Sequence, residues 1–560
     1  MALPWHIPSS ALPRDFNNVD EKGSSCDQSY RIDIHQNPRN QLQTGIICEI
    51  GEYNRDPSTI QRLIASGMTV ARLNLKDHEP DVCSQLVQSI RQAVVNYSIE
   101  LDYVYPLALI VDVQGPDIVT GNLKGGPKNI IELIVNESIK LTTDSSWQDC
   151  GTVECLFIDY NHLTDLQCGD GIYIDSLRSG QIKLAITDIG EDSVNCTVTK
   201  GGIIGSKMTA RIYKVPNEVQ SHKRISSTES LCNNHSSSQS YENIKAQINW
   251  AVSADIDAII VPNVKEIEDM RSVRDILSDK GKHILVYASI DSLTGYDNFD
   301  TILLEADGVY VDRFVLCNDL PVEKIFIAQK VILAKCNNIG KPCIFKAVLN
   351  EQVPTLCVTD IANLILDGVD VLSFELHYDF PLKKQVSSFN DIRIAEHCLT
   401  AACVVCKNAE RVSEPLGKLK SHANNLGGPA KLIGLSAVDL AAYSKASAII
   451  CLTSSGRTAK IISHLRPNCV IVAITRACHT ARQLRFWKGV QPLHYYEAPK
   501  PSWAMEVGSR ISAALDYCKS KRILCAGDPY VLVTGSRRGA GYCDSIKLLY
   551  ASAKDTMFLE

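Results

Sequence analysis

One short stretch of this 560-residue chain has residue types and a spacing suited to binding an anion. A predicted strand, AIICLTS, runs into SSGRTAK, which opens a predicted helix with hydroxyl residues and Gly456. Such a turn points backbone N–H groups and the positive end of a helix dipole at a phosphate or carboxylate. Because serine and glycine are also common helix caps, this stretch alone is weak evidence for a ligand site.

A second candidate is the CxxC motif formed by Cys403 and Cys406 within EHCLTAACVVCK. It has no partner pair at zinc-finger spacing, and its surroundings are apolar. We therefore interpret it as part of a structural helix, with a metal or redox site as the alternative. The 21 cysteines of the chain are scattered and lie mostly in apolar runs, as expected of buried thiols in a reducing cytosol.

The elements that must position such residues are short β-rich runs, several of them separated by helical patterns that close with glycine. The runs are nearly continuously apolar, which is typical of parallel strands buried on both faces. Eight such strands with crossover helices predict an α/β chain with a (β/α)8 TIM barrel. The runs are TGIICEIG, MTVARLN, LALIVDVQG, IDAIIVPN, HILVYAS, DGVYVD, PCIFKAV and VDVLSFE.

Two further units are predicted. Between the third and fourth runs the sequence alternates with period two and carries Gly and Asp turns, which indicates an inserted all-β lid domain. After a polar Ser- and Asn-rich linker and the remaining barrel runs, the later runs AIICLTS, VIVAITR and YVLVTGS indicate a C-terminal α/β domain. We place the N-terminal tail at 1–43, the barrel at 44–116 and 241–390, the lid at 117–217, the linker at 218–240 and the C-terminal domain at 391–560.

The bulk properties are those of an ordinary globular protein. Hydrophobic residues make up 45% of the chain and charged residues 21%, with a net charge of −6. This charge provides no basic surface for nucleic acid or for an anionic membrane. The start lacks a secretory signal, and no window approaches 18 consecutive apolar residues. We therefore expect a cytoplasmic protein without nucleic-acid or membrane partners.

In order and spacing, these landmarks resemble the pyruvate kinase family from about Thr44 to the C-terminus. The resemblance implies phosphoryl transfer from phosphoenolpyruvate to ADP, giving pyruvate and ATP in glycolysis, with Mg2+ and K+ as cofactors. It does not cover the first 43 residues or the linker. The landmarks that carry it include TGIICEIG, SGMTVARLN, IVDVQGPDIVTG, GGIIGSK, ILLEADGVYVDR, LTSSGRTA and VLVTGSRRGAGY.

The resemblance also implies that parts of the phosphoryl-transfer site are lost. Such a site positions its substrate and neutralises charge on phosphate oxygens. The family's catalytic lysine corresponds to Ser289, and a threonine implicated in proton delivery corresponds to Ala347. Of the two carboxylates that hold the divalent metal, one corresponds to Asp291 and the other to Val315. The carboxylates that we can place at this mouth are Asp291, Asp312 and Glu375.

Other parts of the site are retained. Arg72 and Arg313 correspond to phosphate-binding arginines, and Asn74 and Asp112 correspond to ligands of the monovalent cation. A third ligand of that cation corresponds to Lys76, whose ammonium would stand where potassium binds. A solvated lysine is the plainer interpretation of Lys76.

The predicted effector site is better preserved. In the family's regulated members, a Thr- and Ser-rich turn binds one phosphate of a sugar bisphosphate, and a Trp with an Arg seven residues later binds the second. Trp503 and Arg510 keep that spacing, and a closing loop carries Arg537 and Gly539. The turn itself corresponds to Thr453, Ser454, Ser455, Gly456, Arg457 and Thr458.

Two hypotheses follow. The first is a catalytically impaired family member that senses fructose 1,6-bisphosphate or acts as a structural subunit, in a homo- or hetero-tetramer with family members. The second is an active enzyme that still converts phosphoenolpyruvate and ADP, with altered metal and potassium requirements.

Overall fold

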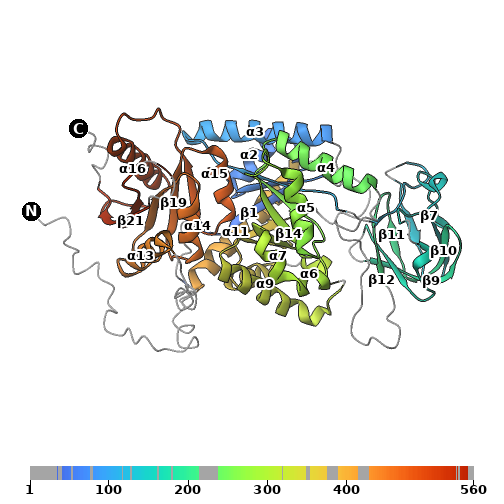
Figure 1. Cartoon of the computed structure of the whole chain (residues 1–560). Coiled ribbons are helices and arrows are strands. Elements are labelled where there is room, and N and C mark those ends of the chain that lie inside the picture. Colours follow the sequence, from blue (N-terminus) through green and yellow to red (C-terminus); the bar gives the residue numbers. More distant parts are fainter. Residues whose placement is uncertain are drawn as a thin grey trace, which may run out of the picture.

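The eight predicted apolar runs form a closed parallel barrel, seen at the centre of the computed structural model in Figure 1. Around the barrel the neighbours follow the order β1–β17–β16–β15–β14–β13–β3–β2, so the prediction of a (β/α)8 barrel is confirmed. Its strands are β1 (Gly45–Glu49), β2 (Val70–Asn74), β3 (Ala108–Asp112), β13 (Ala258–Val261), β14 (Leu285–Ser289), β15 (Gly308–Val311), β16 (Cys343–Ala347) and β17 (Val371–Phe374).

The structure describes residues 35, 41–51, 54–75, 80–115, 118–126, 129–160, 163–177, 181–213, 238–317, 319–348, 354–374, 389–413, 428–537, 539 and 543–552. Of the residues predicted to form sites, Lys76 and Glu375 lie outside this part of the chain, as does most of the predicted linker.

Helices cover the outside of the barrel. Helix α9 ends at Gly340 with φ of 84°, in line with the predicted glycine closures. At the start of α2, the Asp56 side chain accepts hydrogen bonds from the N–H groups of Ser58 and Thr59. The helices are α2 (Pro57–Ala65), α3 (Pro80–Leu101), α4 (Ser238–Ser253), α5 (Ile267–Leu277), α6 (Leu293–Asp297), α7 (Phe299–Glu305), α8 (Arg313–Leu316), α9 (Ile325–Ile339), α10 (Pro354–Leu366) and α11 (Phe389–Val412).

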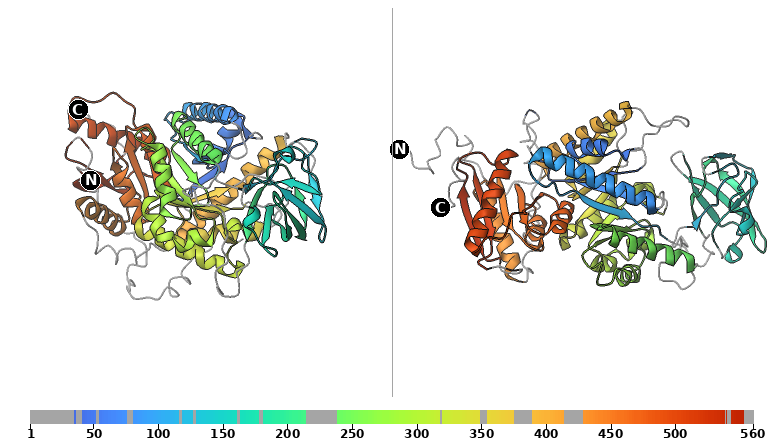
Figure 2. Two further views of the ribbon diagram at one scale, coloured as in Figure 1. Left: turned by 45° about the vertical axis from the view of Figure 1, so that its right-hand side comes forward. Right: turned by 90° about the horizontal axis from the view of Figure 1, so that it is seen from above.

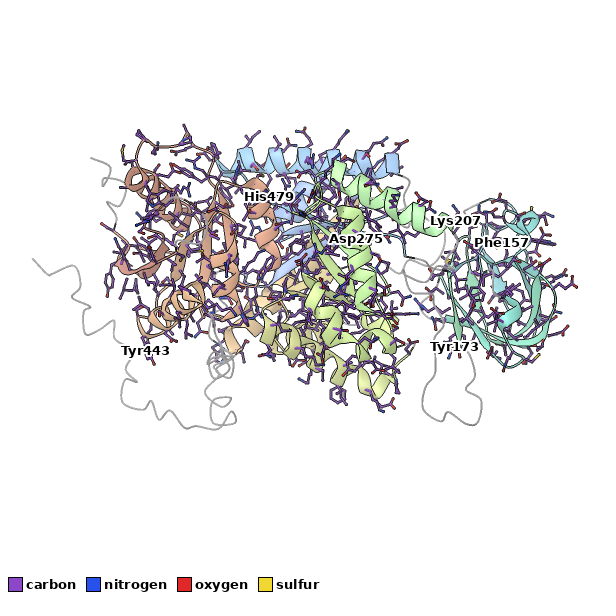
Figure 3. All side chains as sticks on the ribbon, in the orientation of Figure 1. Phe157, Tyr173, Lys207, Asp275, Tyr443 and His479 are labelled. Carbon is purple, nitrogen blue, oxygen red and sulfur yellow. The ribbon has the colours of Figure 1, made fainter. Side chains whose placement is uncertain are left out.

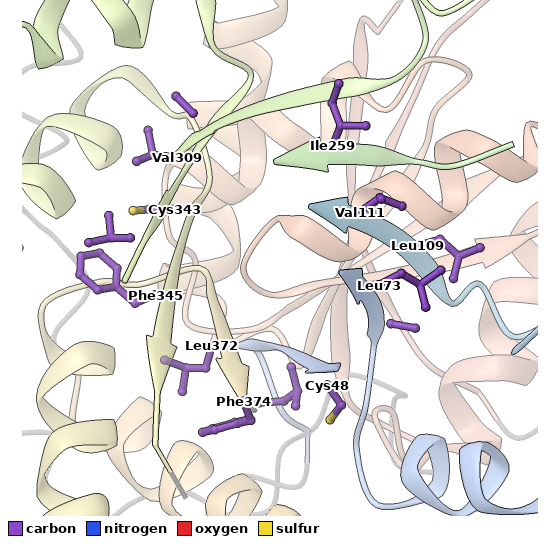
Figure 4. Close-up of a cluster of buried hydrophobic side chains, with 14 of the residues drawn as sticks. Cys48, Leu73, Leu109, Val111, Ile259, Val309, Cys343, Phe345, Leu372 and Phe374 are labelled. Atoms are coloured by element: carbon purple, nitrogen blue, oxygen red, sulfur yellow. The ribbon is translucent and has the colours of Figure 1, made fainter. Parts of the chain in front are cut away.

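Successive strand residues alternate between the two faces of the barrel wall. One set, which includes Val309, Phe345 and Phe374, packs against the surrounding helices (Figure 4). The other set, which includes Ile47 and Tyr287, fills the barrel interior and continues into residues of the C-terminal unit. Fully burying each such large side chain stabilises the fold by about 1.5–3 kcal/mol. The alternation also decides which residues near the strand ends point into the barrel.

Strands β4 to β12, which follow β3 and precede α4, form the inserted all-β unit. Its strands alternate buried and exposed residues, as β9 does with Ile182, Leu184 and Ile186 buried. Phe157, Tyr173 and Lys207 belong to this unit (Figure 3). A seven-stranded sheet has the order β4 (Ile118–Val119), β12 (Thr209–Tyr213), β8 (Gly171–Asp175), β9 (Gln181–Ile189), β10 (Ser193–Lys200), β6 (Ser138–Thr142), β7 (Cys155–Phe157), and a two-stranded sheet pairs β11 (Gly202–Ile204) with β5 (Ile131–Leu133).

The C-terminal α/β unit is built on a five-stranded sheet. Three of its strands are those predicted from the sequence, while β20 and β22 were not expected. The sheet order is β20 (Val490–His494), β19 (Val470–Thr475), β18 (Ala448–Leu452), β21 (Pro529–Thr534), β22 (Ser545–Tyr550), and the helices are α13 (Pro429–Tyr443), α14 (Arg457–His464), α15 (Cys478–Gln483) and α16 (Trp503–Ser520).

Helix α11 contains the CxxC motif and packs with the barrel. Cys403 and Cys406 are both buried, and burial raises the pKa of the Cys403 thiol to about 11. Burial likewise raises the pKa of Cys406. Leu399 and Ala402 of the same helix lie in the cluster between the barrel strands and their helices. From this packing we propose that the boundary of the C-terminal unit lies after α11 rather than at residue 391.

The C-terminal unit is attached to the amino-terminal ends of the barrel strands. Arg482 of α15 binds Asp257, which precedes β13, with Nε and Oδ1 2.7 Å apart. The residues before β1 also cross to this unit: Gln41 Nε2 donates to the carbonyl of Lys521, and the carbonyl of Gln43 accepts from the N–H of Gly489. The barrel therefore lies between the C-terminal unit and the inserted β unit, as Figures 1 and 2 show.

Across the described residues, we find no helix with the length and apolar character needed to cross a membrane.

Candidate functional site

The carboxyl ends of the barrel strands form a mouth lined by polar side chains. Active sites of (β/α)8 enzymes lie at this end of the barrel. On most strands, the inward-facing residue closest to the carboxyl end is polar. It is either one of the last residues of the strand or the residue that follows the strand. These residues are Glu49 of β1, Arg72 of β2, Asp112 of β3, Ser289 of β14, Asp312 after β15, Lys346 of β16 and Ser373 of β17.

Arg72 and Asp112, predicted to bind a phosphate and a monovalent cation, bind each other. Arg72 Nε donates to Asp112 Oδ2 at 3.0 Å, and a second nitrogen of the guanidinium reaches the same oxygen. Glu49 lies 3.8 Å from the guanidinium, and the ring of Tyr310 lies 5.1 Å from its centre. Burial acts to lower the pKa of Arg72, but its acidic neighbours, chiefly Asp112, outweigh burial and raise that pKa. Asn74 lies opposite Asp112 in the sheet register.

The carboxylate predicted to hold a divalent metal is also engaged. Ser289 Oγ, at the position of the family's lysine, donates to Asp291 Oδ1 at 2.8 Å. The N–H of Asn263 donates to the other oxygen of Asp291 at 2.9 Å. Val315, in the short helix α8, has no oxygen in its side chain to offer a metal. Of the two positions that the resemblance assigns to the divalent metal, only Asp291 therefore carries carboxylate oxygens, and each of them already accepts one hydrogen bond.

Arg313 and Ala347 lie away from the interior of the mouth. The Arg313 guanidinium binds Asp360 of α10 in a bidentate pair and also donates to Gln329 of α9 at 3.0 Å. This pairing holds Arg313 against the helix layer, whereas Arg72 lies on the inward face of the barrel. Ala347 is buried in the cluster between the strands and the helices.

Lys346 is a mouth residue that the sequence reasoning missed. It lies two positions after Ile344 on β16, so it shares the inward face with that residue. Its Nζ binds Asp312 Oδ2 at 2.8 Å, while Asp312 Oδ1 accepts from the N–H of Phe314 and caps α8. A lysine at an inward position of an otherwise apolar strand was the available signal.

The mouth residues traced here carry more negative than positive charge. The acids are Glu49, Asp112, Asp291 and Asp312, and the cations are Arg72 and Lys346. No group of three or more His, Cys, Asp or Glu side chains within the described part of the chain is arranged to hold a metal ion.

The predicted effector residues come together around one pocket of about 350 Å³ in the C-terminal unit. The turn before α14 is shaped by Gly456, whose N–H donates to Thr453 Oγ1 at 3.0 Å and whose φ is 78°. A left-handed conformation of this kind favours glycine. Trp503 Nε1 donates to the carbonyl of Gly535 and joins α16 to the loop that carries Arg537. Predicted residues that line the pocket are Thr453, Ser454, Ser455, Arg457, Thr458, Trp503, Arg510, Arg537 and Gly539.

The wall of this pocket is cationic. Lys431, Arg457, Arg510 and Arg537 line it, and none of the described lining residues is acidic. Lys431, from the start of α13, was not anticipated, because nothing in the local sequence links that helix to the turn before α14. The pocket therefore offers several positive charges to one ligand.

Behind the wall, Glu506 of α16 holds two arginines. Its Oε1 accepts from Arg510 Nε at 2.8 Å and from Arg476 Nε at 2.7 Å, and its Oε2 accepts from the N–H of Lys500. The hydrogen bond from Arg476, followed by those from Lys500 and Arg510, lowers the pKa of Glu506 to about 2 although burial opposes this shift. Glu506 is thus ionised at neutral pH and holds Arg510 in place.

A (β/α)8 barrel with an inserted β unit, a polar mouth and a cationic pocket in a separate α/β unit defines a multidomain barrel protein with two candidate sites. The chain matches the family model for the pyruvate kinase barrel domain over residues 41–376 and that for the pyruvate kinase alpha/beta domain over residues 431–549. It belongs to the pyruvate kinase family.

Curated proteins that are similar to this chain are also pyruvate kinases. Pyruvate kinase PKLR of Rattus norvegicus and that of Homo sapiens are each 29% identical to this chain, over 93% of it and 87% of their own length. Pyruvate kinase of Schizosaccharomyces pombe is 26% identical over 91% of this chain and 95% of its own.

Proposed function

We propose that this chain is a pyruvate kinase family protein strongly impaired or inactive in phosphoryl transfer, with a C-terminal pocket that binds a sugar bisphosphate such as fructose 1,6-bisphosphate. The observation that carries the proposal is the contrast between the two sites. Carboxylates outnumber cations among the mouth residues traced above, whereas four cations line the C-terminal pocket.

The barrel half of the proposal rests on charge. Transfer of a phosphoryl group from phosphoenolpyruvate to ADP requires positive charge around the phosphate oxygens. Ser289 stands where the family has a lysine, and the positive charge of Arg72 is already paired with Asp112. Losing one cationic stabiliser costs about 10³- to 10⁵-fold in rate in comparable phosphoryl-transfer systems. At about 1.4 kcal/mol for each tenfold, that is about 4–7 kcal/mol of transition-state stabilisation.

The effector half rests on the shape and charge of the pocket. The turn from Thr453 to Thr458 supplies hydroxyl and N–H donors beside Arg457, and it opens the eight-residue helix α14. Trp503 and Arg510 line the same pocket from α16. A ligand with two phosphates would place one group at the turn and the other beside α16. Arginines bind phosphate well because their planar donors match its oxygens.

Ligand-induced stabilisation tests the effector half. Fructose 1,6-bisphosphate at about 100 times its Kd should stabilise the folded chain by ~2.7 kcal/mol, which raises the melting temperature by a few degrees. Fructose 6-phosphate, with one phosphate, is the matched control and should give a smaller shift. No shift with millimolar fructose 1,6-bisphosphate would remove this half of the proposal.

A coupled assay with phosphoenolpyruvate and ADP tests the barrel half. The competing function is an active pyruvate kinase with altered metal and potassium requirements, and the ammonium of Lys346 at the mouth is the observation that favours it. The assay should use Mg2+ or Mn2+, each with and without potassium. Turnover within tenfold of an ordinary relative would disprove the impairment. If the rate of turnover is the same with and without potassium, that result would support the idea that the ammonium of Lys76 replaces that cation.

We also propose that the chain assembles as a homo- or hetero-tetramer with family members. Large apolar side chains on the surface around α8 and α9 support a subunit contact, since Phe314, Val322 and Phe326 are each more than half exposed. Light scattering on the purified chain, alone and mixed with an active relative, tests the assembly. A monomer in both experiments would rule it out.

A further inference from the structure

Lys346 has surroundings that differ from those of the lysines on the protein surface. It lies in the interior of β16, on the face that points into the barrel, and its side chain is 16% exposed. Its partner Asp312 is 10% exposed by the same measure, so the ion pair is largely removed from water. Taking such a pair out of water carries a desolvation cost that the attraction between the charges only partly offsets. Stability alone is therefore a weak reason for a lysine at this position.

A buried hydroxyl lies beside this lysine on the next strand. The register pairs Lys346 with Ser373 of β17, and both residues occupy the inward face. Ser373 is fully buried, and its Oγ has no hydrogen-bond partner among the described residues. Buried hydroxyl groups are normally hydrogen-bonded, so this one is suited to a partner that is not part of the chain.

The two groups together form a donor pair for an anion. An ammonium offers three N–H donors and a hydroxyl offers one more. Asp312 holds the lysine through Oδ2 and is itself fixed through the bond from the N–H of Phe314 to Oδ1. An anion that enters the mouth would share the ammonium with Asp312 and accept the proton of Ser373 Oγ.

We propose that Lys346 is the ammonium that binds an anionic ligand at the barrel mouth, with Ser373 as a second donor and Asp312 as a positioning residue. The ligand class is a small molecule with a carboxylate or a phosphate group, of which phosphoenolpyruvate carries both. This inference rests on the proposed function only because it places a carboxylate- or phosphate-bearing ligand at the barrel mouth. A chain that binds phosphoenolpyruvate but does not convert it would agree both with the proposed impairment and with the role of Lys346.

Isothermal titration of the full chain with phosphoenolpyruvate, with and without Mn2+, tests the inference without relying on activity. Lys346→Met should weaken binding about 10- to 100-fold, as expected for loss of a charged hydrogen bond, and Lys346→Arg should stay within a few-fold of the natural chain. Ser373→Ala should weaken binding several-fold. Titrations with oxalate and with inorganic phosphate identify which group of the ligand Lys346 receives.

The direction in which Asp312→Asn changes the affinity for phosphoenolpyruvate distinguishes a binding role of Lys346 from a structural one. Asparagine still caps α8 but competes less for the ammonium, so it should tighten binding several-fold. If Lys346 had only a structural role, Asp312→Asn and Lys346→Met would both lower the melting temperature but leave the affinity for phosphoenolpyruvate unchanged. Lys330→Met is the matched control, because Lys330 pairs with Asp367 in the helix layer and should leave affinity unchanged.

Three results would overturn the inference: no binding of phosphoenolpyruvate by the natural chain up to about 10 mM, unchanged affinity in Lys346→Met, or weaker binding in Asp312→Asn. If Lys346→Met does not fold, Lys346→Arg and Asp312→Asn still decide the question. Rapid turnover in the coupled assay would disprove the impairment while leaving the role of Lys346 intact.

Discussion

Replacing Glu506 with glutamine should separate the stability of the C-terminal unit from its affinity for an anion. Glu506 is fully buried and accepts hydrogen bonds from Arg476, Arg510 and the N–H of Lys500. Glutamine keeps the shape and one oxygen acceptor but removes the negative charge behind the pocket wall. The two arginines then share a neutral partner.

The expected loss of stability follows from the burial of the pair. Removing one partner of a buried ion pair costs about 3–5 kcal/mol. The Arg476 side chain is 29% exposed, so water replaces part of its interaction and about 2–3 kcal/mol is the expected loss at pH 7. The pKa of Glu506 is lowered from 4.5 to about 2, so its stabilisation is complete above pH 4.5 and disappears as the pH falls towards 2. The difference between the two proteins should shrink over that range.

Affinity should change in the opposite direction. If a phosphate bound in the pocket lies about 8–10 Å from the Glu506 carboxylate, the two charges repel each other by about 0.5–2 kcal/mol at an effective dielectric constant between 20 and 80. Glu506→Gln should therefore bind fructose 1,6-bisphosphate about 2- to 30-fold more tightly than the natural chain. Urea unfolding at pH 7 and pH 4, together with calorimetric titration, measures both quantities.

The matched control is Glu497→Gln. Glu497 also lies near this cluster and accepts a hydrogen bond from Tyr495, but its side chain is 51% exposed. Its replacement should change stability by less than about 1 kcal/mol. Weaker binding of the bisphosphate by Glu506→Gln would refute the reasoning, because it would show that holding Arg510 in position matters more than the negative charge behind it.

Three further predictions address other parts of the molecule. Gly456→Ala should destabilise the chain by about 1–2 kcal/mol and reduce the thermal shift with fructose 1,6-bisphosphate, because φ is 78° and a Cβ would lie 3.2 Å from Leu484 and Thr480. Asp112→Asn should cost about 3–5 kcal/mol in urea unfolding, since it leaves the buried Arg72 without its main counter-charge; a loss below 1 kcal/mol would contradict the pairing. Burial lowers the pKa of Lys488 to about 8, so the unfolded chain binds more protons above that pH, and stability should rise by about 2 kcal/mol between pH 7.5 and 9.5. Lys488→Met should abolish that rise, and an equal rise in the variant would exclude Lys488 as its source.

Much of the fold was predictable because parallel strands buried on both faces leave long apolar runs in the sequence. The two strands that were missed have clear reasons. β20 lies at an edge of its sheet and contains Pro492, which lacks the N–H that a central strand needs. β22 is the opposite edge strand and pairs antiparallel with β21, and none of its residues is fully buried, so it lacks a continuous apolar signal.

The candidate sites were predictable to different degrees. The turn proposed to bind an effector is local in sequence, so Thr453 and Arg457 could be assigned together, and they line one pocket. The barrel mouth is assembled from eight strands that are separated in the sequence. The contacts in it therefore depend on which side chains of different strands and helices lie close together after folding. The sequence does not show that Arg313 pairs with Asp360 or that Lys346 pairs with Asp312, because those partners lie 47 and 34 residues away along the chain.

The residues that precede β1 have a practical consequence for anyone who shortens this protein. Gln41 and Gln43 are hydrogen-bonded to the far end of the chain, at Lys521 and Gly489. A chain that starts at Gly45 would keep all eight barrel strands yet lose these bonds between its first and last units. Limited proteolysis should then cut between the units sooner, although the barrel itself would keep its shape.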